Sequence, residues 1–181
     1  QKKTIAIMLT AGKYEHALSC LKKLSAENKN DAELLDLAGQ YYITQKKDDS
    51  VNLCCEKIKK SAPDYELYLL HWAKRYNEAG DNEKSRSMYM KYLESNNKDA
   101  CAWVDLACLD EEMGNNAEAE DEYSTALAFD PANYAAKLLL KKLCEKRREQ
   151  QELQEEEPND FDLGDYIEQS EQENDELAET L

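Results

Sequence analysis

Apolar residues recur along most of the chain at the spacing of one α-helix face. Within each of three sets, apolar residues follow the i, i+3, i+4 spacing of side chains on the same side of a helix, and two of the sets continue to i+7. The sets are Leu35, Ala38, Gly39 and Tyr42, then Leu69, Trp72, Ala73 and Tyr76, then Trp103, Leu106 and Ala107. After a short break each set is followed by a second amphipathic stretch, from Val51 to Ile58, from Ser85 to Tyr92 and from Ala119 to Ala126. The pattern therefore predicts helices in pairs.

Two kinds of break separate these helices. Within a pair the break combines a helix stop with polar caps for the next helix, and it reads Lys47-Asp48-Asp49, Gly80-Asp81-Asn82 and Gly114-Asn115-Asn116. Between pairs, Pro63-Asp64 and Asp130-Pro131 end the second helix, because proline cannot continue a helix. Each pair is a helix-turn-helix.

The pairs repeat every 34 residues without insertion or deletion. We call positions 34 residues apart a column, and four columns follow this shared frame. They are Gly12, Lys46, Gly80 and Gly114; Ala17, Val51, Ser85 and Ala119; Leu21, Cys55, Tyr89 and Tyr123; and Leu24, Ile58, Tyr92 and Ala126. A fixed period of this length is typical of a stacked repeat protein, in which no unit can bury its apolar face alone.

The repeat resembles the tetratricopeptide repeat (TPR) family, most clearly in the unit from Ala100 to Asn133. The family pattern of Trp, Leu, small residue, Gly, Ala, aromatic, Ala and Pro is met by Trp103, Leu106, Ala107, Gly114, Ala119, Tyr123, Ala126 and Pro131. Asp110 departs from it, because the family has Tyr there, as Tyr42 and Tyr76 do in earlier units. The resemblance covers residues 1 to about 133.

The fold class we expect is all-α, an α-solenoid of TPR helix-turn-helix units with a C-terminal capping helix and a disordered acidic tail. The boundaries are a partial unit at 1–31, full units at 32–65, 66–99 and 100–133, a capping helix at 134–150 and the tail at 151–181. Gln1 falls inside a helix of the frame, so we expect the chain to be the C-terminal part of a longer array. In the capping helix Leu138, Leu139, Leu140, Leu143 and Cys144 are expected to pack inward.

Close packing of the paired helices accounts for the small residues of the frame. We expect Gly39, Ala73 and Ala107 to lie where the second helix crosses the first, opposite Val51, Ser85 and Ala119. Large side chains, Trp72, Trp103, Tyr89 and Tyr123, are expected to fill the gaps between neighbouring units.

The charge of the chain is concentrated at one end. The net charge is -16, from 39 acidic and 23 basic residues, yet residues 149–181 hold 14 of the acids and no Lys or Arg. The remaining 25 acids and 23 bases nearly cancel, so the array itself is close to neutral. This balance argues against direct nucleic-acid binding, which requires a basic surface. The chain also has no apolar run of about eighteen residues and therefore no predicted membrane insertion.

Candidates for catalysis or metal binding are weak. The six cysteines form no C-x-x-C pair, and we interpret them as buried reduced thiols, with a metal site or disulfide framework as the lesser alternative. His16 and His71 have no nucleophile at a suitable spacing, and the adjacent acids Asp110, Glu111 and Glu112 are best explained as a solvated helix face. We therefore expect no enzyme, no cofactor and no small-molecule substrate.

The resemblance implies a concave groove, lined by the first helix of each unit, that binds a protein partner. In this frame the lining residues are Asp36, Gln40, Leu67, Leu70, His71, Lys74, Cys101, Val104, Asp105 and Cys108. Leu67, Leu70, Cys101, Val104 and Cys108 would be apolar residues exposed in the groove, and such patches often mark a bound segment. The equal alternative is that a neighbouring helix or the chain's own tail covers them.

Some TPR co-chaperones bind the C-terminal carboxylates of heat-shock chaperones with Lys, Arg and Asn on consecutive first helices. The corresponding positions here read Asp36, Gln40, His71, Cys101 and Asp105, so this clamp is absent. With Asp36, Asp105, Glu111 and Glu112 nearby, the expected ligand has apolar anchors and Lys or Arg. It would be an extended or helical segment, or another solenoid subunit.

The tail offers a second interaction site. A short apolar island, Phe161, Leu163, Tyr166 and Ile167, lies among its acids, and such islands can fold onto a partner, although a solubilising tail is the simpler interpretation. Our first hypothesis is an intracellular, cytoplasmic scaffold within a multi-subunit assembly. A nuclear or ciliary assembly is an open alternative. The alternative is a regulatory or chaperone-like module whose acidic tail binds a basic partner.

Overall fold

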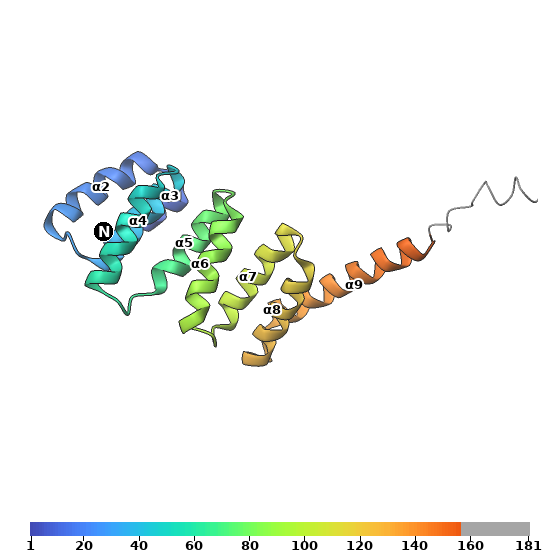
Figure 1. The fold of residues 1–181 in the computed structure, drawn as a ribbon. Helices are drawn as coiled ribbons and strands as arrows, with labels where there is room; N and C mark the ends of the chain where they lie inside the picture. Colours follow the sequence, from blue (N-terminus) through green and yellow to red (C-terminus); the bar gives the residue numbers. More distant parts are fainter. Residues whose placement is uncertain (157–181) are drawn as a thin grey trace, which may run out of the picture. The chain divides into compact units, whose positions relative to one another are not determined.

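The computed structural model describes residues 1–156 of the 181-residue chain. Over this range it is built from nine α-helices and no strand, in the order shown in Figure 1. The helices are α1 (Lys2–Thr10), α2 (Tyr14–Glu27), α3 (Ala32–Thr44), α4 (Asp48–Ser61), α5 (Leu67–Glu78), α6 (Asn82–Ser95), α7 (Ala100–Met113), α8 (Asn116–Phe129) and α9 (Tyr134–Glu156). The all-α prediction is confirmed for this part of the chain.

The helices pack as consecutive pairs. Within residues 1–141, which form one compact unit, α3 packs against α4, α5 against α6 and α7 against α8. The pairs are joined by α1 and α2 packing against α3, by α3 against α5 and by α6 against α7. The buried core is shared between pairs, since Ala38 and Tyr42 contact both of its clusters. This is the arrangement of an α-solenoid, in which each unit is stabilised by its neighbours.

The turn inside each pair uses the left-handed backbone region. Gly12, Gly80 and Gly114 have φ angles of 69°, 77° and 85°, values that glycine adopts without steric cost. Lys46, in the same column, has a φ angle of 55° and is the only non-glycine residue with a positive φ among the described residues. The column found by its period is thus the position at which the first helix of each pair ends.

Helix starts agree less well with the predicted caps. The Asp81 side chain accepts a hydrogen bond from the backbone N–H of Lys84, as expected for an N-cap. Lys47 and Asn115 make no such bond. Two further caps lie between pairs, where Asp31 accepts from Leu34 and Asp99 from Cys101 and Ala102.

The close helix crossing is confirmed in the α5–α6 pair, and Gly39 has a close neighbour that the sequence did not predict. The Ser85 hydroxyl donates to the carbonyl of Ala73 at 2.8 Å, so these two helices approach closely. A Cβ atom added to Gly39 would overlap the indole ring of Trp72. Gly39 must therefore be small to leave room for a tryptophan of the next pair.

The large aromatic side chains are not all alike. Trp72, Tyr89 and Tyr123 are buried, at 1%, 3% and 0% exposure. Trp103 is only partly buried, and its indole N–H donates to the backbone carbonyl of Asn97 in an exposed position. Complete burial between units is therefore observed for Trp72 and not for Trp103.

The last helix is longer than the predicted cap. It continues to Glu156 rather than residue 150. Of its leucines, Leu143 is buried and Leu139 and Leu140 are half-buried, whereas Leu138 is exposed, contrary to expectation. No helix of the described residues is both long and apolar enough to cross a membrane. The tail motif Phe161, Leu163, Tyr166 and Ile167 lies outside the described residues.

Candidate partner-binding groove

The predicted groove residues lie on three consecutive first helices. Asp36 and Gln40 are on α3; Leu67, Leu70, His71 and Lys74 on α5; Cys101, Val104, Asp105 and Cys108 on α7. Side chains link these helices at two points, from α5 to α3 through His71 and from α5 to α7 through Lys74.

Asp36 is the centre of a buried hydrogen-bond network. One carboxylate oxygen accepts from the Gln40 amide at 3.0 Å. The other accepts from the Tyr65 hydroxyl at 2.9 Å and lies 2.6 Å from Nδ1 of His71. Since Asp36 is 2% exposed, these partners replace the water that an exposed carboxylate would have. Burial, followed by the charge of Asp36, raises the pKa of the Tyr65 hydroxyl, so it remains a donor.

The network continues along α5. The Trp72 indole N–H donates to the backbone carbonyl of Asp36 at 3.1 Å. Arg75 donates to the Gln40 side-chain oxygen at 3.4 Å and forms an ion pair with Glu78 at 2.6 Å. The bonds from Trp72 and Arg75 to α3 hold α3 and α5 in one register.

Three of the predicted lining residues are not available to a partner. Asp36, Gln40 and Val104 are buried, so the expected exposure of Val104 is wrong, and the expected lining residues Asp36 and Gln40 offer no free side chain. The packing of α3 against α5 encloses the first two, and their polar atoms are already bonded to each other, to His71 and to Arg75. The sequence period indicates which helix face a residue occupies, but not how deeply the next helix covers it.

The accessible residues form a smaller surface, which we call the groove surface: Leu67, Leu70, His71, Lys74, Cys101, Asp105 and Cys108. Leu67 is 43% exposed and the side chain of His71 is 39% exposed, and Cys101 is also exposed. Because His71 donates through Nδ1 to a buried carboxylate when neutral, its Nε2 atom is the one left to accept a hydrogen bond.

The charges of this surface are largely paired. Lys74 and Asp105 lie 2.8 Å apart. Cys108 accepts a hydrogen bond from the Tyr123 hydroxyl at 3.3 Å, and burial raises the pKa of its thiol, which disfavours the thiolate that nucleophiles and metal ligands require. Within residues 1–156 no group of three His, Cys, Asp or Glu side chains is placed to hold a metal ion, and no disulfide is present.

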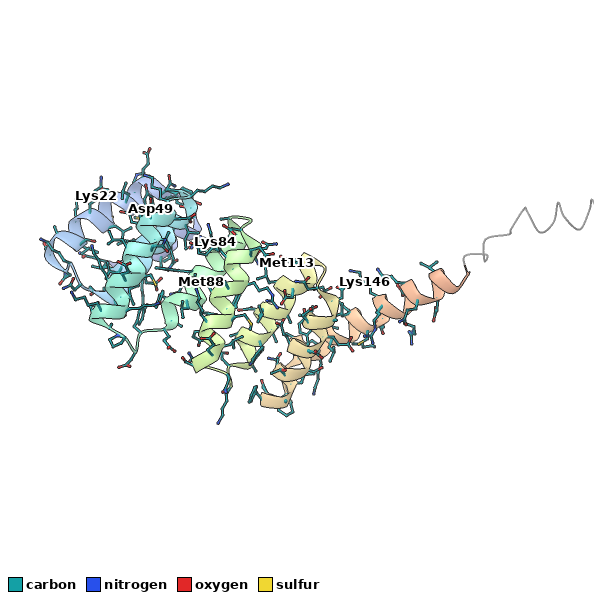
Figure 2. All side chains as sticks on the ribbon, in the orientation of Figure 1. Lys22, Asp49, Lys84, Met88, Met113 and Lys146 are labelled. Atoms are coloured by element: carbon teal, nitrogen blue, oxygen red, sulfur yellow. The ribbon has the colours of Figure 1, made fainter. Side chains whose placement is uncertain are left out.

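A separate hollow lies at the turns of the pairs. Its lining includes Tyr76, Lys84 and Met113, of which Lys84 and Met113 are labelled in Figure 2. The Lys84 ammonium forms ion pairs with Asp48 at 2.8 Å and Asp81 at 3.0 Å and lies over the Tyr76 ring. The charge of Lys84 is therefore satisfied within the protein, and the groove surface remains the better candidate for partner binding.

Three polar residues with partners in the protein interior were not indicated by the sequence pattern, and a fourth was placed at the surface. Tyr65 lies in the connection before α5, outside the helix period, and Arg75 and Glu122 lie on helices at positions to which the repeat pattern assigned no role. Asp110, interpreted as part of a solvated face, is fully buried. Its departure from the Tyr of its column was the available signal.

Comparison with known proteins supports the fold. No protein-family model and no curated protein sequence matches the chain. Solved structures do match: one from the characterisation of Pseudomonas aeruginosa PilF has a TM-score of 0.60 at 15% identity, covering 82% of this chain and 68% of that one. The thermophilic TPR protein TTC0263 of Thermus thermophilus has a TM-score of 0.58 at 17% identity, covering 77% of each chain.

A third match was solved with a ligand. The first TPR domain of Spaghetti (RPAP3), bound to the HSP90 peptide SRMEEVD, has a TM-score of 0.51 at 20% identity and covers 65% of this chain and 93% of that one. At these identities the likeness concerns the backbone. Together with the 34-residue period and the helix pairs, it shows that this chain has the fold of the tetratricopeptide repeat proteins.

Proposed function

We propose that the chain is a non-enzymatic scaffold that binds an extended or helical segment of a protein partner on the groove surface, within a larger assembly. The observation that carries this proposal is the exposure of Leu67 beside Leu70, with Cys101 exposed on the next first helix. Apolar side chains gathered on one face favour a binding site. The peptide-bound neighbour, which shares the fold, supports a peptide as the kind of ligand.

The chemistry of the groove surface favours a mostly apolar ligand. Lys74 and Asp105 neutralise each other, and the buried Asp36 is occupied by its own partners, so neither supplies a strong charge. Besides the buried Asp110, the remaining acids of α7 are Glu111, half-buried, and Glu112, exposed. We therefore propose apolar anchors over Leu67 and a basic residue of the partner near Glu112.

The test is binding of selected peptides to matched variants. Peptides would be selected from a random phage-displayed library against the 181-residue protein, and their affinities measured by fluorescence anisotropy. Leu67→Glu should weaken binding roughly 10- to 100-fold, since burial of one leucine side chain contributes about 1.5–3 kcal/mol. Leu53→Glu is the matched control, because Leu53 is similarly exposed, at 51%, but lies on α4.

Equal affinity for the two variants would contradict the proposal. Val104→Glu is not a suitable probe, because Val104 is buried and the change would disturb folding. The same peptides test the alternative, an acidic tail that binds a basic partner, which the 14 acids of residues 149–181 favour. Truncation before Glu149 should then abolish a strongly salt-dependent binding, whereas groove binding should persist.

A further inference from the structure

Two columns of the repeat change character together in the unit formed by α7 and α8. The column of Asp110 holds Met8, Tyr42 and Tyr76 in the other units, and the column of Glu122 holds Cys20, Cys54 and Met88. Aromatic or sulfur-containing side chains are thus replaced by two carboxyl groups. Both remain in the interior, because Asp110 is 0% and Glu122 8% exposed.

A single guanidinium faces both acids. Arg86 of α6 donates through Nε to the two oxygens of Asp110, at 2.7 and 2.9 Å. The Asn115 side-chain amide donates to Asp110 at 2.9 Å. Asp110 therefore has the hydrogen-bond donors that a buried carboxylate requires.

Glu122 lacks such partners. Oε2 of Glu122 is buried and has no hydrogen-bond partner, and Asp110 is the charged group that influences Glu122 most. The charged groups facing Glu122 are Asp110 of α7, Arg86 of α6 and Glu118 of its own helix. Two carboxylates buried against one guanidinium repel each other, and a hydrogen bond between two carboxyl groups requires a proton.

We propose that Asp110 and Glu122 share one proton at neutral pH, and that this proton locks α8 onto α7. In the locked state the protonated Glu122 donates to the Asp110 carboxylate, which also accepts from Arg86 and Asn115. Loss of the proton to solvent leaves two carboxylates on one guanidinium and weakens the packing of the pair. The same geometry shifts the titration of the group: burial, followed by the charge of Asp110, raises the pKa of Glu122 to about 8.

The sign of the pH dependence follows from this direction. In the unfolded chain Glu122 loses its proton near its ordinary pKa of about 4.3, whereas the folded protein keeps it until about pH 8. Between these values the folded state binds one more proton, so its stability falls as pH rises and becomes level above pH 8. One proton changes the unfolding equilibrium constant tenfold per pH unit, about 1.4 kcal/mol.

The experiment compares urea unfolding of the full chain from pH 5 to pH 9 with that of Glu122→Gln. The glutamine amide can donate to Asp110 as the protonated acid does, but it does not titrate. We expect the logarithm of the ratio of the two unfolding constants to change by about one unit per pH unit up to about pH 8 and then to become level. Glu118→Gln is the control, since Glu118 is exposed on the same helix and the slope should remain.

A direct reading of the proton does not depend on unfolding. At pH 7 the infrared carbonyl band of a protonated carboxylic acid should be present in the wild-type protein and in Glu118→Gln and absent in Glu122→Gln. A wild-type protein without this band, or one whose stability changes with pH in parallel with that of Glu122→Gln, would overturn the proposal.

Discussion

The junction between the α3–α4 and α5–α6 pairs differs in chemistry from the junction between α5–α6 and α7–α8. At the first, α3 packs against α5 and the Trp72 ring lies on Gly39. At the second, α6 packs against α7, and Arg86 reaches the buried Asp110. The tryptophan of the second junction, Trp103, is partly exposed. One backbone frame thus supports an aromatic contact in one place and a buried ion pair in the next.

This difference shows that the repeat fixes the backbone arrangement but not the chemistry of the contacts between units. The stability of a solenoid is close to a sum of unit and nearest-neighbour contributions. Each junction can therefore contribute its own dependence on packing or pH to the stability of the whole array. The first junction depends on packing around Trp72 and on a network whose acid, Asp36, is surrounded by donors. The second contains two acids and one guanidinium, and the proton that we propose the two acids share makes its stability depend on pH.

The largest expected effect is the loss of the aromatic contact at the first junction. Trp72→Ala removes a side chain that is 1% exposed together with its hydrogen bond to the Asp36 carbonyl. It should lower the free energy of unfolding by about 3–5 kcal/mol, as measured by urea denaturation. Trp103→Ala is the matched control and should cost clearly less, because that ring is partly solvated already. Equal losses would mean that the two junctions do not differ in this way.

Gly39→Ala tests the same contact from the other side. Alanine normally stabilises a helix interior over glycine by about 0.5–1 kcal/mol. Here the new methyl group would overlap the Trp72 ring, and we expect a net loss of about 1–3 kcal/mol from overpacking. In a Trp72→Ala background the same change should be stabilising. A double-mutant cycle by urea denaturation measures this reversal, and a loss that persists without the indole would contradict the proposed cause.

The sequence predicted the positions of the repeat units better than the side-chain contacts between them. The 34-residue period located the helix pairs and the left-handed turn column, because both follow from local backbone requirements. It could not show that Gly39 makes room for Trp72, since a small residue fits both a helix crossing and a neighbouring ring. The end of α9 was also misjudged, because the polar residues after position 150 continue the helix to Glu156.

For the candidate site, the sequence predicted which helix face each residue occupies but not how deeply the residue is buried. Exposure was correctly expected for Leu67 and Cys101, whereas Val104, in the column of Leu70, is buried. The partners of Asp36 lie 29 residues away at Tyr65 and 35 residues away at His71. Such pairs arise from the packing of different units and leave no periodic signal in the sequence. The groove's role in binding stays a prediction.

The smallest expected effect concerns the turn that breaks the glycine column. Lys46 has the left-handed conformation of Gly12, Gly80 and Gly114, which costs a non-glycine residue about 1–2 kcal/mol. Lys46→Gly removes this cost but increases the flexibility of the unfolded chain, so we expect a net gain of about 0.5–1 kcal/mol.

This gain should appear as a rise in Tm of about 1–4 °C for a chain of this size, measured by circular dichroism. The mirror variant, Gly80→Ala, should lower the Tm. A Cβ atom at Gly80 would meet nothing within 4 Å, so its cost is conformational, unlike the steric cost at Gly39. If Lys46→Gly lowered the Tm, contacts of the lysine side chain, and not its backbone, would decide the stability of the turn between α3 and α4.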